Sequence, residues 1–162
     1  AAVKHYPGLG AVSGNPDFPT EGILDTTTTL GGAEAGAFDQ AITKTDPAMV
    51  MMSLATYQSI DPNNPAVFSS TIIDGHIRNA LKYTGVVISD SMSAEALSSY
   101  DVSQLGVKLV EAGGDMSCIG QTDYVKPIVD GLNERAKSDP AFASKVTAAT
   151  RVMALKIKMG LA

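Results

Sequence analysis

The sequence has little of what disulfide-bonded, zinc-binding or nucleic-acid-binding proteins need. Its 162 residues include one cysteine, two histidines and no tryptophan. The lone Cys118 excludes an intrachain disulfide and a cysteine-rich zinc site, and with two histidines no metal site can be assembled, so we expect no metal and no cofactor. Twelve Lys and Arg residues against seventeen Asp and Glu residues give a net charge of −5, and the basic residues are scattered singly. This pattern argues against binding to nucleic acid or anionic lipid.

Long apolar runs and long polar tracts are also missing. No apolar run approaches the ~20 residues that span a membrane, so we expect no integral membrane segment. With 44% hydrophobic and 18% charged residues, the composition is that of a globular domain rather than a disordered segment. The first residues do not show a basic segment followed by an apolar stretch, so any signal peptide is expected to lie upstream. We therefore expect residues 1–162 to form a single unit.

Short apolar runs alternate along the chain with segments of helical periodicity. The expected strands are 1–5, 48–53, 85–89 and 115–119, and the expected helices are 33–44, 70–82, 101–113, 122–137 and 140–159. Parallel neighbours need a crossover, which a helix supplies, so this alternation predicts the α/β class with helices covering a parallel sheet. Four βα units with an extra C-terminal helix fit a small open sheet or half of an eight-unit closed barrel, and the pattern alone leaves both open.

The connection after the first strand, residues 6–31, is rich in Gly, Pro, Asn and Thr and is far longer than most strand-to-helix loops. Long loops are usually functional, so we expect part of a site here. A dinucleotide-binding loop over residues 8–14 is disfavoured. Its glycine spacing is wrong by one, and residues 15–19 do not begin a helix, whereas a phosphate-binding loop leads directly into one.

In both architectures ligands collect at the carboxyl ends of the strands, where Lys4, His5 and Asp90 stand. Asp90 ends an apolar run, which suits a nucleophile or base, although it could instead cap a helical turn over residues 91–97. Lys4 and His5 could belong to the site, or they could be an exposed lysine and a buried structural histidine. As strand neighbours they should point to opposite faces unless the strand bends, so one is expected to face the site.

The segment Lys4-His5-Tyr6-Pro7-Gly8-Leu9-Gly10 resembles the Lys-His-Phe-Pro-Gly-x-Gly motif of glycoside hydrolase family 3, in its β-N-acetylglucosaminidase branch. Residues 85–90, Gly-Val-Val-Ile-Ser-Asp, look like the nucleophile strand of that family. Further stretches resemble the family in the same order, so the likeness covers nearly the whole chain; these stretches are residues 50–52, 66–69, 93–96, 111–115 and 151–161.

The resemblance implies a (β/α)8 TIM-type barrel in which this chain supplies strands five to eight. The N-terminal half of the barrel would then be a partner, from the same precursor or from a separate chain. It also implies a retaining hydrolase of β-linked N-acetylglucosamine or a related cell-wall sugar, with Asp90 as the nucleophile and with Lys4 and His5 contacting the carbohydrate substrate. The compartment stays open, and a secreted or cell-envelope location is favoured over the cytoplasm.

The second catalytic group departs from the family pattern. In that branch the acid/base is an Asp-x-His pair in the loop after the first motif, and here the aligned residues are Asn15-Pro16-Asp17, while the motif's second histidine is Leu9. The prediction is that Asp17 is a substitute acid/base. The alternative is that Asp17 is a turn residue in a carbohydrate-binding pseudoenzyme without a working acid/base. A third hypothesis, a self-sufficient nucleotide-binding α/β domain, requires a monomer that binds nucleotide.

Overall fold

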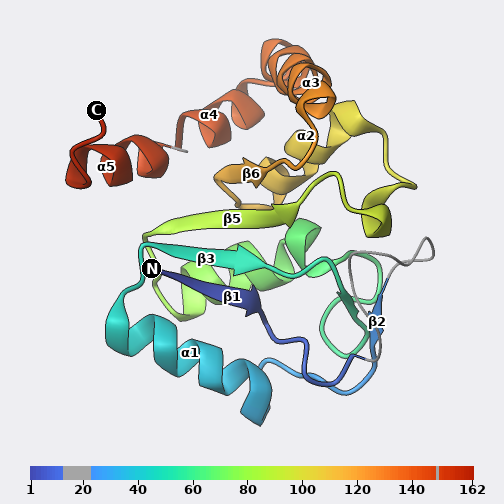
Figure 1. Cartoon of the computed structure of the whole chain (residues 1–162), viewed down its shortest axis with the longest axis vertical. Helices are drawn as coiled ribbons and strands as arrows, with labels where there is room; N and C mark the ends of the chain where they lie inside the picture. The colour runs from blue at the N-terminus through green and yellow to red at the C-terminus, as the bar shows by residue number, and fades with distance from the viewer. Residues whose placement is uncertain (13–22, 149) are drawn as a thin grey trace.

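The computed structural model of the chain describes residues 1–12, 23–148 and 150–162. Four of its strands form a parallel sheet in the order β1-β3-β5-β6, and all four point the same way in Figure 1. These strands are β1 (Ala2–Tyr6), β3 (Met49–Met52), β5 (Val86–Ser91) and β6 (Met116–Cys118). The predicted α/β class and all four predicted strands are therefore confirmed, with small shifts at their ends.

Helices connect successive strands, as the alternation predicts, and further helices follow the last strand. They are α1 (Ala33–Thr45), the π-helix η2 (Thr71–Ala80), α2 (Val102–Ala112), α3 (Val125–Ser138), α4 (Pro140–Ala148) and α5 (Thr150–Lys158). Single 3₁₀ turns lie at Ala66–Phe68, Glu95–Leu97 and Thr122–Tyr124. The second predicted helix exists, but it is wider than an α-helix because it has hydrogen bonds five residues apart, such as that from Gly75 N–H to the Ser70 carbonyl.

The bounds of α2 follow from two residues that the sequence singles out. The Asp101 carboxylate accepts the Ser103 N–H at 2.8 Å, which satisfies one of the free amides of the first turn. The helix ends at Gly113, whose φ of 102° is left-handed and suits glycine. Both predicted ends of this helix are confirmed.

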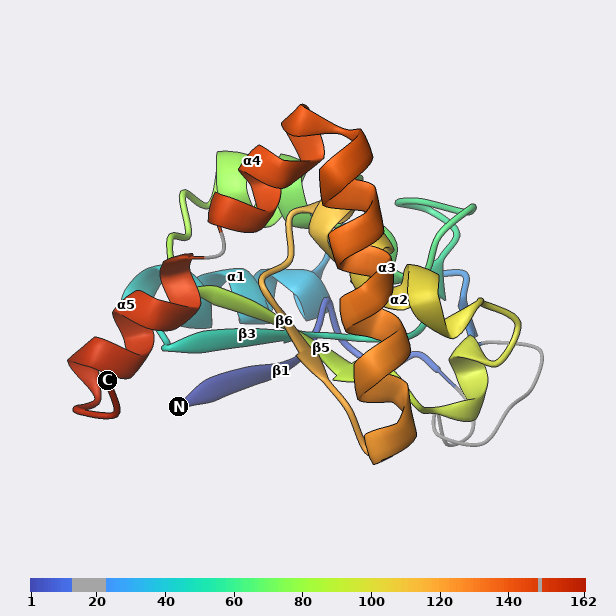
Figure 2. The same cartoon turned by 90° about the horizontal axis from the view of Figure 1, so that it is seen from above.

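The core lies between the sheet and the helices. Val50, Met52 and Val87 are fully buried in it, whereas their strand neighbours Met49 and Met51 are only half-buried. Because side chains alternate along a strand, these methionines face the other side of the sheet. Figure 2 shows the sheet edge-on, with most of the helical mass on one side. One face of the sheet is therefore packed as a core, and the other is left accessible at the strand ends.

The connection expected over residues 6–31 contains a short strand that the sequence does not reveal. This strand, β2 (Leu24–Asp25), pairs in parallel with β4 (Thr56–Tyr57). The pair lies beyond the carboxyl ends of the large sheet (Figure 1). Two residues are too short to carry an alternating pattern, so periodicity could not predict this pair. Residues 13–22 of the same connection, including Asp17, lie outside the described residues.

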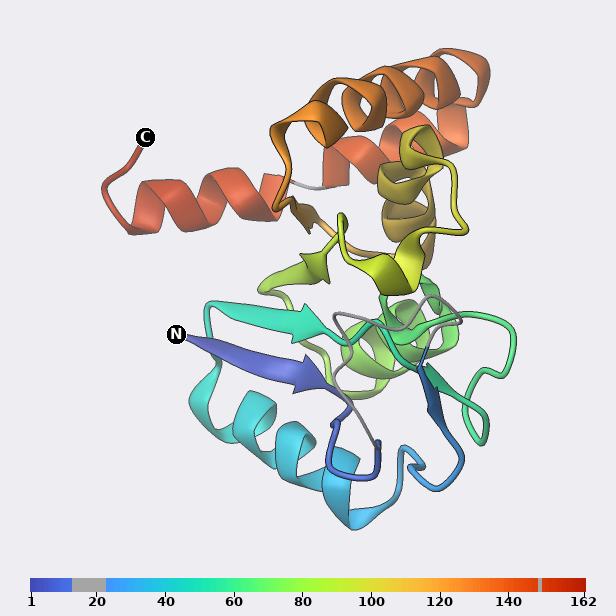
Figure 3. The ribbon, with the colours of Figure 1, turned by 45° about the vertical axis from the view of Figure 1, so that its right-hand side comes forward.

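The segment predicted as a helix over residues 140–159 forms α4 and α5 on either side of residue 149, which lies outside the described residues (Figure 3). Phe142 of α4 is buried against Val107 and Val110 of α2. Arg151 of α5 instead binds Asp115 at the start of β6, at 2.9 Å. α4 and α5 therefore contact different parts of the fold.

Candidate functional site

The carboxyl ends of β1 and β5 bring together two of the predicted site residues. His5 Nε2 lies 3.3 Å from Asp90 Oδ2, although β3 lies between the two strands. The side chains are 27% and 23% exposed, so the pair is partly enclosed and still open to a ligand. An imidazole beside an accessible carboxylate can orient that carboxylate and can donate a hydrogen bond to it.

Asp90 is the penultimate residue of β5, and its second oxygen is also engaged. Oδ1 accepts the N–H of Ser91 at 2.8 Å. The alternative role of Asp90 as the cap of a turn over residues 91–97 is not supported, because helical structure begins only at Glu95 and its N-cap is Ala94. Asp90 is two residues after Ile88, so both lie on the face of the sheet away from the helices.

A β-bulge changes how Lys4 and His5 are presented. Val3 pairs with Val50 and Tyr6 pairs with Met52, so three steps along β1 match two steps along β3. Lys4 and His5 therefore stand together opposite one residue of β3, and the regular strand on which the expectation of opposite faces depends is interrupted here. Lys4 is exposed, and His5 contacts Asp90.

The first turn after β1 is held by a carboxylate from α1. Glu34 Oε1 accepts the Gly10 N–H at 2.5 Å, and Glu34 Oε2 accepts the Thr28 hydroxyl at 3.1 Å. Gly8 has a φ of 131°, and a Cβ at this position would lie 2.5 Å from Glu34 Cγ. The Gly8 carbonyl accepts a hydrogen bond from the buried Tyr57 hydroxyl. The glycine of the motif is thus required by both the backbone angle and the close approach of Glu34.

The end of the same connection is fixed by Asp25, which is 1% exposed. Its Oδ1 accepts the backbone N–H groups of Thr27 and Thr28 at 2.8 and 2.7 Å, and its Oδ2 accepts the Thr28 hydroxyl at 2.7 Å. Burial alone would raise the pKa of Asp25, but these hydrogen bonds outweigh it and hold the pKa below its ordinary value. Sequence reasoning missed Asp25; the available signal was an Asp followed by polar turn formers, Thr-Thr.

Sequence reasoning also missed a polar network on the helix side of β1. The Tyr6 hydroxyl donates to Asp39 Oδ1 at 2.9 Å, and Asp39 Oδ2 lies 2.9 Å from His76 Nε2. Burial, together with the negative charge of Asp39, raises the pKa of Tyr6. The sequence assigns no role to His76, and the structure shows that its imidazole contacts Asp39 of α1.

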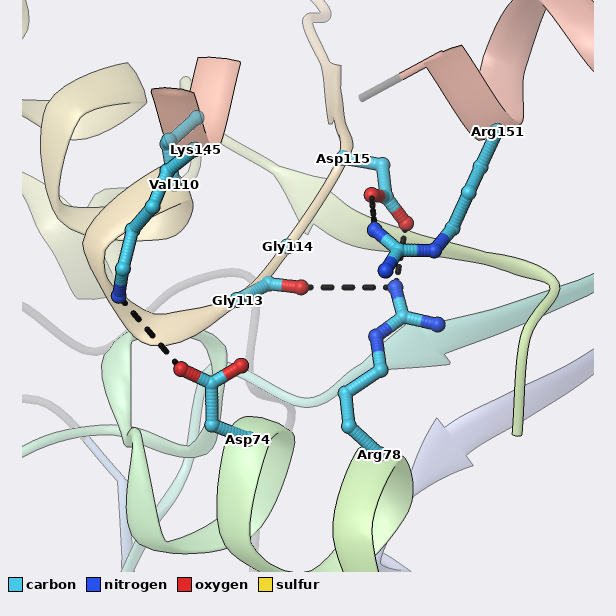
Figure 4. A pocket seen from close by; sticks show the side chains of 8 residues that line it. All are labelled: Asp74, Arg78, Val110, Gly113, Gly114, Asp115, Lys145 and Arg151. Atoms are coloured by element: carbon cyan, nitrogen blue, oxygen red, sulfur yellow. Dashed lines mark hydrogen bonds and ion pairs between the residues drawn. The ribbon is translucent and has the colours of Figure 1, made fainter. Parts of the chain in front are cut away.

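The opposite end of the sheet carries a second polar cluster, around a cavity of about 90 Å³. Figure 4 shows Asp115 between Arg78 and Arg151, at 2.5 and 2.9 Å. Asp115 also accepts the Val87 N–H at 2.8 Å, and its side chain is 1% exposed. This cluster ties the starts of β5 and β6 to η2 and α5, so we read it as structural.

Within residues 1–12, 23–148 and 150–162, no group of three or more His, Cys, Asp and Glu residues is placed to hold a metal ion. In the same part of the chain, each helix is too short or too polar to cross a membrane.

Comparison with known proteins agrees with the geometry. Residues 1–155 match the model of the glycosyl hydrolase family 3 N terminal domain. An uncharacterized secreted glycosyl hydrolase of Arthroderma benhamiae is 31% identical over 121 residues, which are 72% of this chain and 33% of that protein. A beta-hexosaminidase of Nitrosomonas eutropha is 29% identical over 120 residues, which are 74% of this chain and 34% of that protein. The chain thus spans about a third of the length of these relatives.

Solved structures extend the likeness to the fold. The beta-N-acetylhexosaminidase of Beutenbergia cavernae superposes with a TM-score of 0.88 at 36% identity, covering 96% of this chain and 46% of that one. The family 3 beta-N-acetylglucosaminidase of a Paenibacillus species gives 0.87 at 27% identity, covering 99% and 31%. Their domain has a TIM-barrel-like α/β fold, so the predicted partial barrel is confirmed. The match over residues 1–155 and these shared folds show that the chain belongs to glycosyl hydrolase family 3.

Proposed function

We propose that this chain is the C-terminal half of the catalytic barrel of a retaining glycoside hydrolase acting on β-linked N-acetylglucosamine or a related cell-wall sugar. The observation that carries the proposal is the 3.3 Å contact between His5 and Asp90. It lies at the carboxyl ends of the strands, where α/β barrels bind their ligands. The printed names of the beta-hexosaminidase and beta-N-acetylglucosaminidase relatives favour this class of sugar.

In the proposed reaction, Asp90 attacks the anomeric carbon of the sugar. The bond to the leaving oxygen breaks as an acid protonates it, and a covalent glycosyl ester forms on the carboxylate. The group that acted as the acid, now deprotonated, then acts as a base on water. The water cleaves the ester, which restores both carboxyl groups with retention of configuration. The hydrogen bond from the Ser91 N–H and the contact with His5 hold the carboxylate in one orientation for this attack.

Lys4, His5 and Asp17 complete the proposed site. Lys4 and His5 would bind sugar hydroxyls from the bulge in β1, where both stand opposite a single residue of β3. Asp17 would be the acid/base, as its position in the loop after the first motif predicts. A carboxyl group suits this role, because it can protonate the leaving oxygen and then act as a base on water.

The remaining half of the barrel would cover what this sheet leaves accessible. β1 and β6 are the two edges of the sheet, and Met116 of β6 is 36% exposed. Closing a barrel pairs both edges and fills the interior with side chains. The longer family 3 relatives supply such additional chain, so we propose an N-terminal half, in the same precursor or a separate chain, as the partner.

Covalent trapping of the full-length protein tests this function. An activated, fluorinated N-acetylglucosaminide should leave its glycosyl group on the peptide that contains Asp90, as seen by mass spectrometry, and Asp90→Asn should abolish the adduct. Asp46→Asn, at the far end of α1, is the control and should label normally. Sugar binding without adduct or turnover would identify a carbohydrate-binding pseudoenzyme instead. Absence of both binding and labelling would refute the proposed sugar class.

A further inference from the structure

A hydroxyl, a carboxylate and an imidazole form a hydrogen-bonded chain behind β1. Tyr6 of β1, Asp39 of α1 and His76 of η2 each come from a different element, and both hydrogen bonds are 2.9 Å long. The Tyr6 ring also lies near parallel to the His76 ring, with centroids 6.4 Å apart, and meets Phe38 edge to face at 5.8 Å. Tyr6 is therefore held by polar contacts at its hydroxyl and by rings at its sides.

Tyr6, which these contacts hold in place, directly follows His5, the residue that contacts Asp90. His5 stands in the bulge, where regular pairing with β3 is interrupted, and Tyr6 is the point at which that pairing resumes. β1 is also an edge of the sheet, so a strand flanks it on one side only in the part of the fold that is described. The backbone of His5 thus depends on the side chain of Tyr6 more than a residue within a regular central strand would.

A carboxylate at position 39 is energetically unfavourable for packing alone. Its side chain is 18% exposed, and both of its oxygens are used, one by Tyr6 and one by His76. Partial burial of a carboxylate is unfavourable unless such hydrogen bonds compensate it. The family motif that this segment resembles has phenylalanine at the place of Tyr6, so the hydroxyl that Asp39 holds is an addition to that motif.

We infer that Asp39 is a positioning residue that acts through Tyr6 to keep His5 within hydrogen-bonding distance of Asp90. Asp39 and Tyr6 lie on the helix side of the sheet, on the face opposite Asp90, and their effect on hydrolysis passes through His5. The part of this inference that concerns hydrolysis rests on the proposed function; the part that concerns the geometry of His5 does not.

A double-mutant cycle in the full-length protein tests the route through His5. Asp39→Ala should lower kcat/KM about three- to tenfold, in keeping with the loss of a hydrogen-bonded anchor rather than of a reacting group. In a His5→Ala background, the same change should lower kcat/KM no further. The control is Gln40→Ala, at the next position of α1, which is exposed and should have no effect in either background. Equal losses in both backgrounds would show a purely structural role and overturn the inference.

A measurement independent of activity decides the geometric part. In a proton–carbon NMR spectrum of the full-length protein, the His5 imidazole signal is assigned by its loss in His5→Gln. Asp39→Ala should move this signal toward its position in Asp90→Ala, whereas Asp39→Asn, which keeps an oxygen to accept the Tyr6 hydroxyl, should move it little. If Asp39→Ala does not fold, Tyr6→Phe, which removes only the hydroxyl, should shift the signal in the same direction.

An unmoved His5 signal in a folded Asp39→Ala or Tyr6→Phe protein would overturn the inference. If the wild-type protein hydrolyses no glycoside, the proposed function fails, and the NMR measurement still decides whether Asp39 positions His5.

Discussion

His5 Nε2 lies 3.3 Å from Asp90 Oδ2, and the strands that carry them are separated by a third strand. Adjacent strands are about 4.8 Å apart, so side chains two strands apart meet only when both lean over the strand between them. The bulge at Lys4 and His5 provides the local bend on one side. The contact therefore depends on an irregularity in β1 as much as on the carboxylate of β5.

The first prediction concerns sugar binding by the bulge. In the full-length protein, Lys4→Ala and His5→Ala should each weaken binding of an N-acetylglucosamine ligand, because each removes a hydrogen bond to a hydroxyl. For Lys4 the loss should be about 1.5–3 kcal/mol, as for a hydrogen bond to a charged group. Isothermal titration calorimetry measures this loss. Lys44→Ala, an exposed lysine on α1, should bind normally, and unchanged affinity in both bulge variants would contradict the assignment.

The second prediction concerns Asp17. An acid catalyst matters most for poor leaving groups, because an alkoxide must be protonated as it departs and a nitrophenolate need not be. Asp17→Asn should therefore slow cleavage of sugar leaving groups severely and of activated aryl groups mildly, and azide should restore turnover where breakdown of the glycosyl-enzyme limits the rate. Steady-state kinetics across a series of leaving groups measures this. Small, equal losses across the series would remove Asp17 from the mechanism.

The third prediction is that residues 1–162, produced alone, lack activity and associate. Among the residues that the structure describes, both edges of the sheet are unpaired, and these edges, together with the apolar face that includes Met49, Met51 and Met116, favour contact between copies. Light scattering should show dimers or larger species, and hydrolysis should appear only when the missing half of the barrel is supplied. A stable monodisperse monomer would count against the proposed division of the barrel.

The fourth prediction links Asp25 to acid stability. Its pKa is lowered in the folded state, so its contribution to stability is complete above the ordinary value of about 4 and is lost as the pH falls through the folded-state value. Asp25→Asn should lower the free energy of unfolding by about 1–3 kcal/mol at pH 7. Below pH 4 the difference from wild type should shrink. Urea unfolding of the full-length protein at several pH values tests this, with the exposed Asp123→Asn as the control. A difference that stays constant with pH would exclude the ionised Asp25 as its source.

The fifth prediction compares two helical glycines. A Cβ at Gly131 of α3 would lie 1.9 Å from the Ser103 carbonyl oxygen of α2, whereas nothing lies within 4 Å of a Cβ at Gly36 of α1. Gly131→Ala should therefore destabilise the fold by about 1–3 kcal/mol through overpacking. Gly36→Ala should stabilise it by about 0.5–1 kcal/mol, because alanine favours the helix. Urea unfolding measures both, and a Gly131→Ala protein of wild-type stability would show that α2 and α3 are not so closely packed.

The parts of the fold that the sequence predicts are those with a local signal. Periodicity predicts the alternating strands and helices, and Asp101 and Gly113 mark the ends of α2 because a cap and a left-handed turn each need a particular residue type. The two-residue strands β2 and β4 carry no such signal. The contacts that α4 and α5 make with distant elements also have no local sequence signal.

The same distinction applies to the candidate site. Asp90 and His5 were predicted as site residues from their places at strand ends and from the family motif, and the structure brings them into contact. The bulge could not be predicted, because it is a property of the pairing between β1 and β3. The hydrogen bonds of Asp39 with Tyr6 and His76 could not be predicted for a similar reason. They join three elements, and the identity of a residue does not indicate a partner that is distant in the sequence.

The extra residue in β1 decides which of two neighbouring rings faces the solvent. Val3 and Tyr6 both pack into the helix-side core although they are three positions apart, which regular alternation does not allow. If residues 3–6 were all kept but paired with β3 in regular alternation, the imidazole of His5 would enter the helix layer and the phenol of Tyr6 would lie on the face of Asp90. Deleting Lys4 would instead leave Val3, His5 and Tyr6 in regular alternation against β3, with both rings on the faces that they occupy now.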